Sequence, residues 1–189
     1  MGLTNQSSGF SLFYDETLKL PLSGDYTVAL AGNPNVGKST VFNALTGLRQ
    51  HTGNWPGKTV TSARGLYSHR GKRIALVDLP GTYSLLPNSI EEKIARDFIL
   101  FGQPDATVVV TDATCLERNL NLVLQVTEIT SKVVVCLNLV DEAKRRKISI
   151  DSKKLAEQLG VPVVPTAAKN GMGLEELKNT INAVASGVL

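Results

Sequence analysis

Cysteine, net charge and long apolar runs are scarce in this sequence, and each shortage excludes a class of protein. The two cysteines, Cys115 and Cys136, are too few for a disulfide framework, so we expect buried or half-buried free thiols in a reducing compartment. No apolar run approaches the length of a membrane span, and residues 1–24 lack the basic start and apolar core of a secretory leader. The two histidines show no metal-site spacing with the cysteines.

The net charge is only +3 over 189 residues, which does not favour a nucleic-acid partner. An apolar content of 42% and a charged content of 20% are ordinary for a globular protein. The length fits one domain with a real core. We therefore expect a cytoplasmic protein in which residues 1–25 form an extension and residues 26–189 form a single domain.

Apolar strand patterns alternate with helical patterns from Tyr26 onward. Such alternation predicts a three-layer α/β fold, with a six-stranded, mostly parallel sheet, one antiparallel strand pair and helices on both faces. The antiparallel pair is expected at residues 63–68 and 73–78, around a tight turn at Arg70 and Gly71. The other strands are predicted over 26–31, 106–112, 132–137 and 161–165, and helices over 39–46, 89–101, 117–130, 151–159 and 174–185.

The segment from Gly32 to Ser39 fits the phosphate-binding pattern G-x-x-x-x-G-K-[ST], with a strand before it and a helix after it. Glycine lets backbone N–H groups approach a phosphate closely, and the helix N-terminus adds its positive dipole end. Lys38 can reach the outer phosphates, and the Ser39 hydroxyl can ligate Mg²⁺. The residues expected to contact nucleotide here are Asn33, Asn35, Val36, Gly37, Lys38, Ser39 and Thr40.

Further signals follow the ends of other predicted strands, where α/β folds bind ligands. Asp78 can hold Mg²⁺ through water, and the Gly81 N–H can reach a terminal phosphate. The Asp141 carboxylate can accept both donors of guanine, a pair that adenine lacks. The Ala168 N–H can donate to the guanine carbonyl. Together these signals favour GTP or GDP over adenine nucleotides, with a base site formed by Asn138, Leu139, Asp141, Ala167, Ala168 and Lys169.

Four runs carry a more specific resemblance: Gly32 to Ser39, Gly53-Asn-Trp-Pro-Gly-Lys-Thr-Val60, Asp78-Leu-Pro-Gly-Thr-Tyr-Ser-Leu85 and Glu117-Arg-Asn-Leu120. Over residues 26–185 the chain resembles the GTPase domain of the ferrous iron transport protein B (FeoB) family, within the Era-like GTPases. The resemblance implies a P-loop NTPase fold and a cytosolic domain that precedes a helical domain and a membrane domain passing Fe²⁺. It also implies a place on the cytosolic face of the bacterial inner membrane, and the end at Leu189 suggests an excised domain.

Hydrolysis needs an explanation, because Thr82 stands where many GTPases carry a water-positioning glutamine. A monovalent cation near the β- and γ-phosphates can supply the missing charge, and the Asn35 side-chain oxygen is placed to bind it. The resemblance implies K⁺ at this point, with backbone carbonyls of Gly53 and Trp55 completing its shell, and Thr59 on Mg²⁺ and the γ-phosphate. The catalytic set expected is Asn35, Lys38, Thr59 and Gly81, acting slowly and with K⁺ stimulation.

Several features of the sequence allow a second interpretation. Asn35 can instead form a turn by bonding its own backbone, and Trp55 can be a surface aromatic that anchors a mobile loop over residues 50–58. The basic run at residues 144–147 reads as a solvated loop, or as a contact for anionic lipid or a neighbouring domain. Leu139 and Ala167 depart from usual guanine-site patterns, which predicts modest affinity and fast GDP release. The whole chain can also be an Era-like ribosome-associated GTPase, or a nucleotide-binding module with negligible turnover.

Overall fold

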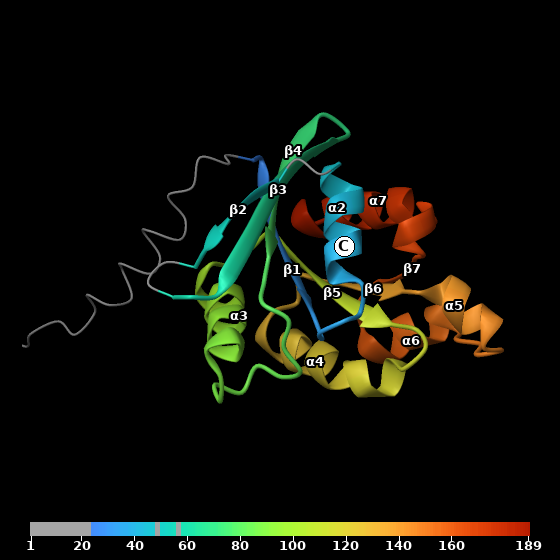
Figure 1. Ribbon diagram of the computed structural model, residues 1–189. Helices are drawn as coiled ribbons and strands as arrows, with labels where there is room; N and C mark the ends of the chain where they lie inside the picture. The colour runs from blue at the N-terminus through green and yellow to red at the C-terminus, as the bar shows by residue number, and fades with distance from the viewer. Residues whose placement is uncertain (1–23, 48–49, 56–57) are drawn as a thin grey trace, which may run out of the picture.

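The computed structural model describes residues 24–47, 50–55 and 58–189, so the expected extension over residues 1–25 lies almost wholly outside the described residues. Within these ranges seven strands form one sheet in the order β2-β3-β4-β1-β5-β6-β7 (Figure 1). The five strands from β4 to β7 in that order run parallel. The bounds are β1 Tyr26–Gly32, β2 Gln50–Asn54, β3 Thr61–His69, β4 Lys72–Asp78, β5 Ala106–Asp112, β6 Val133–Asn138 and β7 Val163–Pro165.

The strand count corrects the expectation of six, because Gln50–Asn54 forms an edge strand rather than a loop. It pairs antiparallel with β3, which also pairs antiparallel with β4, so there are two antiparallel pairs instead of one. Thr52, Gly53 and Asn54 are exposed. An edge strand held by backbone bonding buries little of its own surface, so its sequence lacks the alternation that marks a strand.

The hairpin of β3 and β4 is confirmed, and its turn lies where the sequence predicts it. Arg70 and Gly71 adopt φ angles of 48° and 75°, the left-handed conformation that a tight two-residue hairpin turn requires. Expected helix starts are also confirmed: Ser89 and Glu92 form a reciprocal capping box, and Asp151 caps the helix that follows it.

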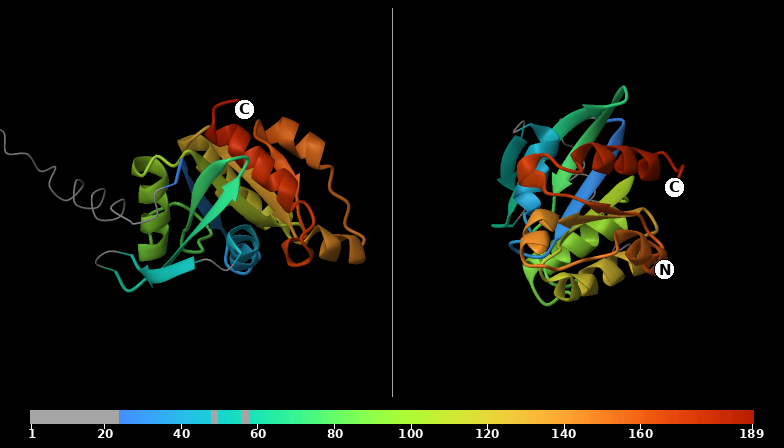
Figure 2. Two further views of the ribbon diagram at one scale, coloured as in Figure 1. Left: turned by 90° about the horizontal axis from the view of Figure 1, so that it is seen from above. Right: turned by 90° about the vertical axis from the view of Figure 1, so that its right-hand side faces the viewer.

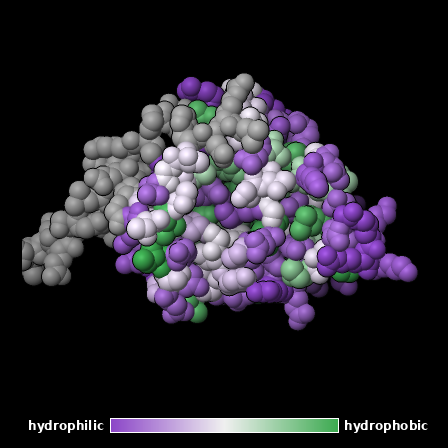
Figure 3. Space-filling model, viewed as in Figure 1, coloured by the Kyte–Doolittle hydropathy of each residue, from purple (hydrophilic) through white to green (hydrophobic). Residues whose placement is uncertain are grey.

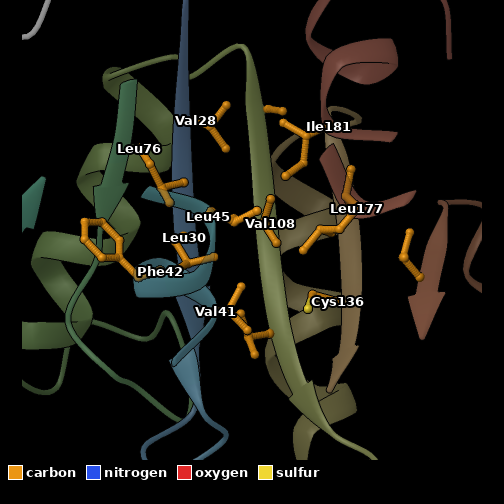
Figure 4. Packing of buried hydrophobic residues seen from close by; sticks show 14 of the residues in the cluster. Val28, Leu30, Val41, Phe42, Leu45, Leu76, Val108, Cys136, Leu177 and Ile181 are labelled. Atoms are coloured by element: carbon orange, nitrogen blue, oxygen red, sulfur yellow. The ribbon is translucent and has the colours of Figure 1, made fainter. Parts of the chain in front are cut away.

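Helices cover both faces of the sheet, as Figure 2 shows from two sides. Under α2 and α7, Val28, Leu30, Leu76, Val108 and Cys136 of the sheet pack against Val41, Phe42, Leu45, Leu177 and Ile181 (Figure 4). A second core on the opposite face lies under α3 and α4. The helices are α2 Lys38–Thr46, α3 Ile90–Phe101, α4 Leu116–Ile129, α5 Val140–Arg145, α6 Ser152–Leu159 and α7 Leu174–Ala185, with a 3₁₀ turn, η1, at Ala168–Asn170.

The basic run expected as a loop belongs partly to α5, whose last turn contains Lys144 and Arg145. Glu142 forms ion pairs with both Arg145 and Arg146, at the i+3 and i+4 spacings that stabilise a helix. Hydrophilic side chains gather over α5 in Figure 3, where residues 144–147 are exposed. Among the described residues no helix is long and apolar enough to cross a membrane.

Candidate functional site

The loops that follow β1, β4, β6 and β7 meet at one edge of the sheet, because these strands are parallel and their carboxyl ends share that edge. The first of these loops, the P-loop of residues 32–39, leads from β1 into α2 (Figure 1). The structure therefore brings together four of the segments that the sequence predicts as a nucleotide site.

The P-loop owes its shape to glycine at one position above all. Gly37 precedes α2 with φ 83°, and a Cβ added there would lie 2.5 Å from the Nδ2 atom of Asn138. Both the positive φ and the close approach exclude a larger residue. Asn35 is exposed with φ 66°, and within the described residues its side chain makes no hydrogen bond. Asn35 thus lies in a turn, but the side-chain bond to its own backbone that the alternative interpretation expects is absent among the described residues, and its amide oxygen has no described partner.

Lys38 links the P-loop to the turn after β4. Its Nζ atom forms an ion pair with Oδ1 of Asp78 and donates a hydrogen bond of 2.7 Å to the Leu79 carbonyl. Burial raises the pKa of the Asp78 carboxyl, and the charge of Lys38 opposes that rise. Gly81 lies against Pro34, since a Cβ added at Gly81 would be 3.5 Å from the Pro34 backbone. The two phosphate-side segments are therefore in contact.

Asn138 joins the phosphate side of the site to the side predicted to hold the base. Its Nδ2 atom donates to the Val36 carbonyl in the P-loop at 3.1 Å. Its Oδ1 atom accepts from the Thr166 hydroxyl at 3.2 Å and from the Ala168 N–H at 3.1 Å. Asn138 and Thr166 are both buried, so these bonds are shielded from water and fix the spacing of three loops.

The residues around the predicted base site are arranged by the same loops. Leu139 adopts φ 62° at the start of α5, which places Asp141 in the first turn of that helix. The Asp141 carboxylate is half-buried and accepts a bond of 3.1 Å from Asn170. Lys169 is exposed, and the Ala167 N–H donates to the Met172 carbonyl at 3.1 Å. The Ala168 N–H that was expected for guanine is held by Asn138, so a base must share or replace that bond.

The residues expected from the first switch are less completely assembled. Thr59 is exposed, Gly53 lies opposite Ser62 in the β2–β3 pair, and no hydrogen bond between described residues links either one to the P-loop. Trp55 is 1% exposed and packs edge-on against Phe98 of α3 with ring centroids 5.7 Å apart. The interpretation of Trp55 as a surface aromatic is therefore wrong.

The Trp55 backbone forms a short turn. Its N–H donates to the Val60 carbonyl at 2.8 Å, and its carbonyl accepts from the Lys58 N–H at 2.9 Å. Coordination of a cation by this carbonyl would have to share the bond with Lys58. The exposed Cys115 likewise corrects the expectation of two buried or half-buried thiols, although Cys136 is fully buried.

One face of α4 contacts the segment that follows Gly81, and this contact was not predicted from the sequence. The Arg118 guanidinium lies 4.7 Å from the centre of the Tyr83 ring, and Asn121 donates to the Tyr83 carbonyl at 3.3 Å. Gln125 accepts from the Leu85 N–H at 2.6 Å. The spacing of Arg118, Asn121 and Gln125 at i, i+3 and i+7 was the available signal, since such residues share one helix face.

The oxygen atoms of Ser39, Asp78 and Asn35 are suitable ligands for hard cations. The Ser39 hydroxyl is exposed at the start of α2, where described residues offer it no hydrogen bond, and the Asp78 carboxylate faces the same loop. Hydroxyl and carboxylate oxygens are the ligands that Mg²⁺ prefers, and the free Asn35 oxygen suits a monovalent cation. The described residues contain no cluster of three or more His, Cys, Asp or Glu that could hold a metal by themselves.

Comparison with known proteins adds an independent finding. A protein-family model described as ferrous iron transport protein B matches residues 26–181. The Fe(2+) transporter FeoB of Salmonella typhimurium is 46% identical over 160 residues, which are 82% of this chain and 21% of that protein. The chain thus spans about a fifth of the length of the curated relatives it matches.

Solved structures show the same likeness. The G domain of the FeoB iron transporter of T. maritima is 48% identical, with a TM-score of 0.80, over 85% of this chain and 98% of that one. The cytosolic domain of the same transporter in its GMPPNP form is 48% identical with a TM-score of 0.82, over 85% of this chain and 64% of that one.

Proposed function

This chain belongs to the ferrous iron transport protein B family, and from that premise we propose that residues 26–189 form a GTP-binding and GTP-hydrolysing domain that regulates Fe²⁺ passage across a membrane. Solved relatives in GDP and GMPPNP forms support the binding of guanine nucleotide. Because the chain spans about a fifth of its curated relatives, the helical and transmembrane parts of a full-length protein are proposed partners at the cytosolic face of the membrane.

One observation carries the proposal: the buried Asn138 amide joins the P-loop at Val36 to the last loop at Ala168. These bonds fix the position of the P-loop relative to the Asp141 carboxylate. That carboxylate can accept hydrogen bonds from the ring N–H and the exocyclic amine of guanine. Adenine presents no such donor pair, so the arrangement selects guanine.

On the phosphate side, Lys38 and the N–H groups of the P-loop bind the β- and γ-phosphates. Ser39 and Asp78 would hold Mg²⁺, which would neutralise part of the phosphate charge. The Gly81 N–H would contact the γ-phosphate. Thr59 would complete this set only after the first switch moves toward the P-loop, as switch segments do when a γ-phosphate binds.

Asn35 is the proposed ligand of K⁺, because its side-chain oxygen is exposed and free in a loop beside the phosphates. Thr82 is 4% exposed and its N–H donates to the Gly32 carbonyl at 3.2 Å, so its side chain is poorly placed to orient water as a glutamine would. Asn35 would hold the cation where it would supply the positive charge that an arginine finger supplies in other systems.

The test is GTP hydrolysis measured in KCl and in NaCl at equal ionic strength, with ATP as the substrate control. We expect stimulation by K⁺ that is lost in Asn35→Ala and retained in the exposed control Asn88→Ala. GTP binding with no difference between the two salts would instead favour a nucleotide-binding module with negligible turnover, which the buried Thr82 also supports. Equal binding of ATP and GTP would overturn the proposal.

A further inference from the structure

Arg64 of β3 is a buried cation without a counter-ion. The residue is 7% exposed, and it forms no ion pair or side-chain hydrogen bond with any residue that the structure describes. Its Nε atom is buried and has no hydrogen-bond partner among the described residues. Its guanidinium lies 5.5 Å from the centre of the Trp55 ring, whose own Nε1 is also buried without a partner. The Nε atom of Arg64 and the Nε1 atom of Trp55 are therefore two buried donors on adjacent side chains, and neither has an acceptor among the described residues.

Two acidic side chains of α3 already have partners of their own among the described residues. Asp97 holds Arg96 at 2.7 Å, and Glu92 is engaged by Ser84 and by the Ser89 backbone. The contact with the Trp55 ring stabilises the cation only in part, because a cation–π contact offsets less than full hydration does. Burial accordingly lowers the pKa of Arg64, since it disfavours the charged form.

Arg64 lies close to the last strand of the sheet that the described residues form. Arg64 pairs with His51 of β2 on one side and with Val77 of β4 on the other, and β2 is the last strand of the sheet. Cross-strand partners share a face, and Val77 belongs to the core under α3 and α4 together with Trp55. Arg64 therefore points to the α3 face, one strand in from the last strand of the described sheet.

We propose that Arg64 and Trp55 form a docking site for the carboxylate of an acidic protein segment. A planar carboxylate matches the fork of a guanidinium, and its single charge neutralises the single buried cation. This chain spans only 21% of a curated relative, so a longer protein of this family contains further segments that can supply the carboxylate.

The experiment uses the fluorescence of Trp55, the only tryptophan of the chain, on nucleotide-free protein without Mg²⁺. The probes are acetate and the peptide Ac-Glu-Glu-Glu-NH₂, titrated at constant ionic strength against NaCl, with Ac-Gln-Gln-Gln-NH₂ as the neutral control. We expect a saturable change with both carboxylate probes, stronger for the peptide, and none with the glutamine peptide. The response should vanish in Arg64→Met and persist in Arg73→Met, which removes an exposed arginine of the neighbouring strand.

Arg64→Lys keeps the charge but loses the fork, and we expect it to bind at least about tenfold more weakly than the wild type. It also tests the site if Arg64→Met does not fold. A response to acetate but not to the acidic peptide would overturn the docking of a protein segment. A stronger response to inorganic phosphate than to acetate would overturn the choice of carboxylate, and an unchanged response in both Arg64 variants, or no saturable response, would overturn the site altogether.

Discussion

Lys38 and Asp78 form an ion pair between the P-loop and the turn after β4. Each side chain therefore binds the other instead of the ligand proposed for it. Lys38 is the side chain proposed to bind the outer phosphates, and Asp78 is the carboxylate proposed to hold Mg²⁺. The side chains are 12% and 17% exposed, so the pair is largely shielded and its charges are balanced. Binding of nucleotide with Mg²⁺ must therefore break this ion pair, so that Lys38 exchanges Asp78 for phosphate while Asp78 exchanges Lys38 for Mg²⁺.

This pairing predicts that Asp78→Asn separates binding of nucleotide from its dependence on Mg²⁺. Without the carboxylate, Lys38 is free for phosphate, and we expect GDP affinity in EDTA to be unchanged or higher. The gain in affinity on adding Mg²⁺ should be lost, because the carboxylate ligand is gone. Titration of a fluorescent GDP analogue with and without Mg²⁺ measures both effects. Asp151→Asn, at a helix cap far along the chain, is the control, and an undiminished Mg²⁺ effect in Asp78→Asn would contradict the assignment.

Lys38→Ala should behave in the opposite way. It removes a charge-assisted contact to phosphate, a loss of about 1.5–3 kcal/mol, so GDP affinity should fall about tenfold or more with or without Mg²⁺. It also leaves Asp78 without its counter-charge, which should raise the pKa of that carboxyl further because burial is no longer opposed. Equilibrium binding at pH 7.5 gives the first effect, and a full-strength affinity in Lys38→Ala would exclude this lysine from the phosphate site.

Asp141→Asn should change which base the site prefers. The aspartate can accept two donors of guanine, whereas an asparagine amide can donate to the second carbonyl of xanthine. We expect GTP affinity to fall by about 1–3 kcal/mol, or roughly five- to 150-fold, with xanthosine triphosphate now binding better than GTP. Competition against a labelled nucleotide measures the ratio. Asn170→Ala, which removes the only described partner of the Asp141 carboxylate, should keep the preference for guanine.

The parts of this site that the sequence predicted are those in which one residue does one local job. Gly37 must adopt a positive φ, and the P-loop pattern shows that need directly. The helix start at Ser89 and the hairpin turn at Arg70 and Gly71 depend only on neighbours within a few positions. Such features leave a local pattern in the sequence, and the capping box and the hairpin turn were found where they were expected.

The parts that were missed depend on contacts between distant positions. Thr166 appeared unremarkable, yet its hydroxyl bonds Asn138, which is 28 residues away. Trp55 is buried because it packs against Phe98 and Arg64, which are distant in the sequence. The strand β2 was recognisable only through its pairing with β3. No periodicity in a polar five-residue strand signals that a partner lies beside it, so these features needed the fold.

The contacts between α4 and the segment after Gly81 predict how readily that segment opens locally. Gln125→Ala removes the acceptor of the Leu85 N–H, a bond of 2.6 Å on a buried residue. A typical hydrogen bond contributes about 1 kcal/mol, so exchange of the Leu85 amide should speed up about fivefold. Hydrogen exchange followed by NMR measures it. Glu128→Ala on the same helix, an exposed side chain, is the control, and unchanged exchange in Gln125→Ala would show that the loop is held by other contacts.

Cys136 predicts how stability falls in alkaline solution. Burial raises the pKa of its thiol from 9.0 to about 12, with a hydrogen bond to Thr166 acting weakly the other way. Between these two values the unfolded chain has released the proton while the folded chain keeps it. Stability is therefore intact below pH 9 and declines as pH rises toward 12, by at most about 1.4 kcal/mol per pH unit from this group. Burial raises the pKa of Tyr67 as well, and that adds a decline of the same sign.

Urea unfolding followed by circular dichroism at pH 7, 9 and 10 tests this decline. Cys136→Ala should lower stability at pH 7, because it leaves a small cavity, yet make the fall between pH 9 and pH 10 shallower than in the wild type. Cys115→Ala is the matched control: its thiol is exposed, so the slope should change less. If Cys136→Ala and the wild type lose stability equally over that interval, the buried thiol does not govern the alkaline limb, and Tyr67→Phe becomes the variant expected to flatten it.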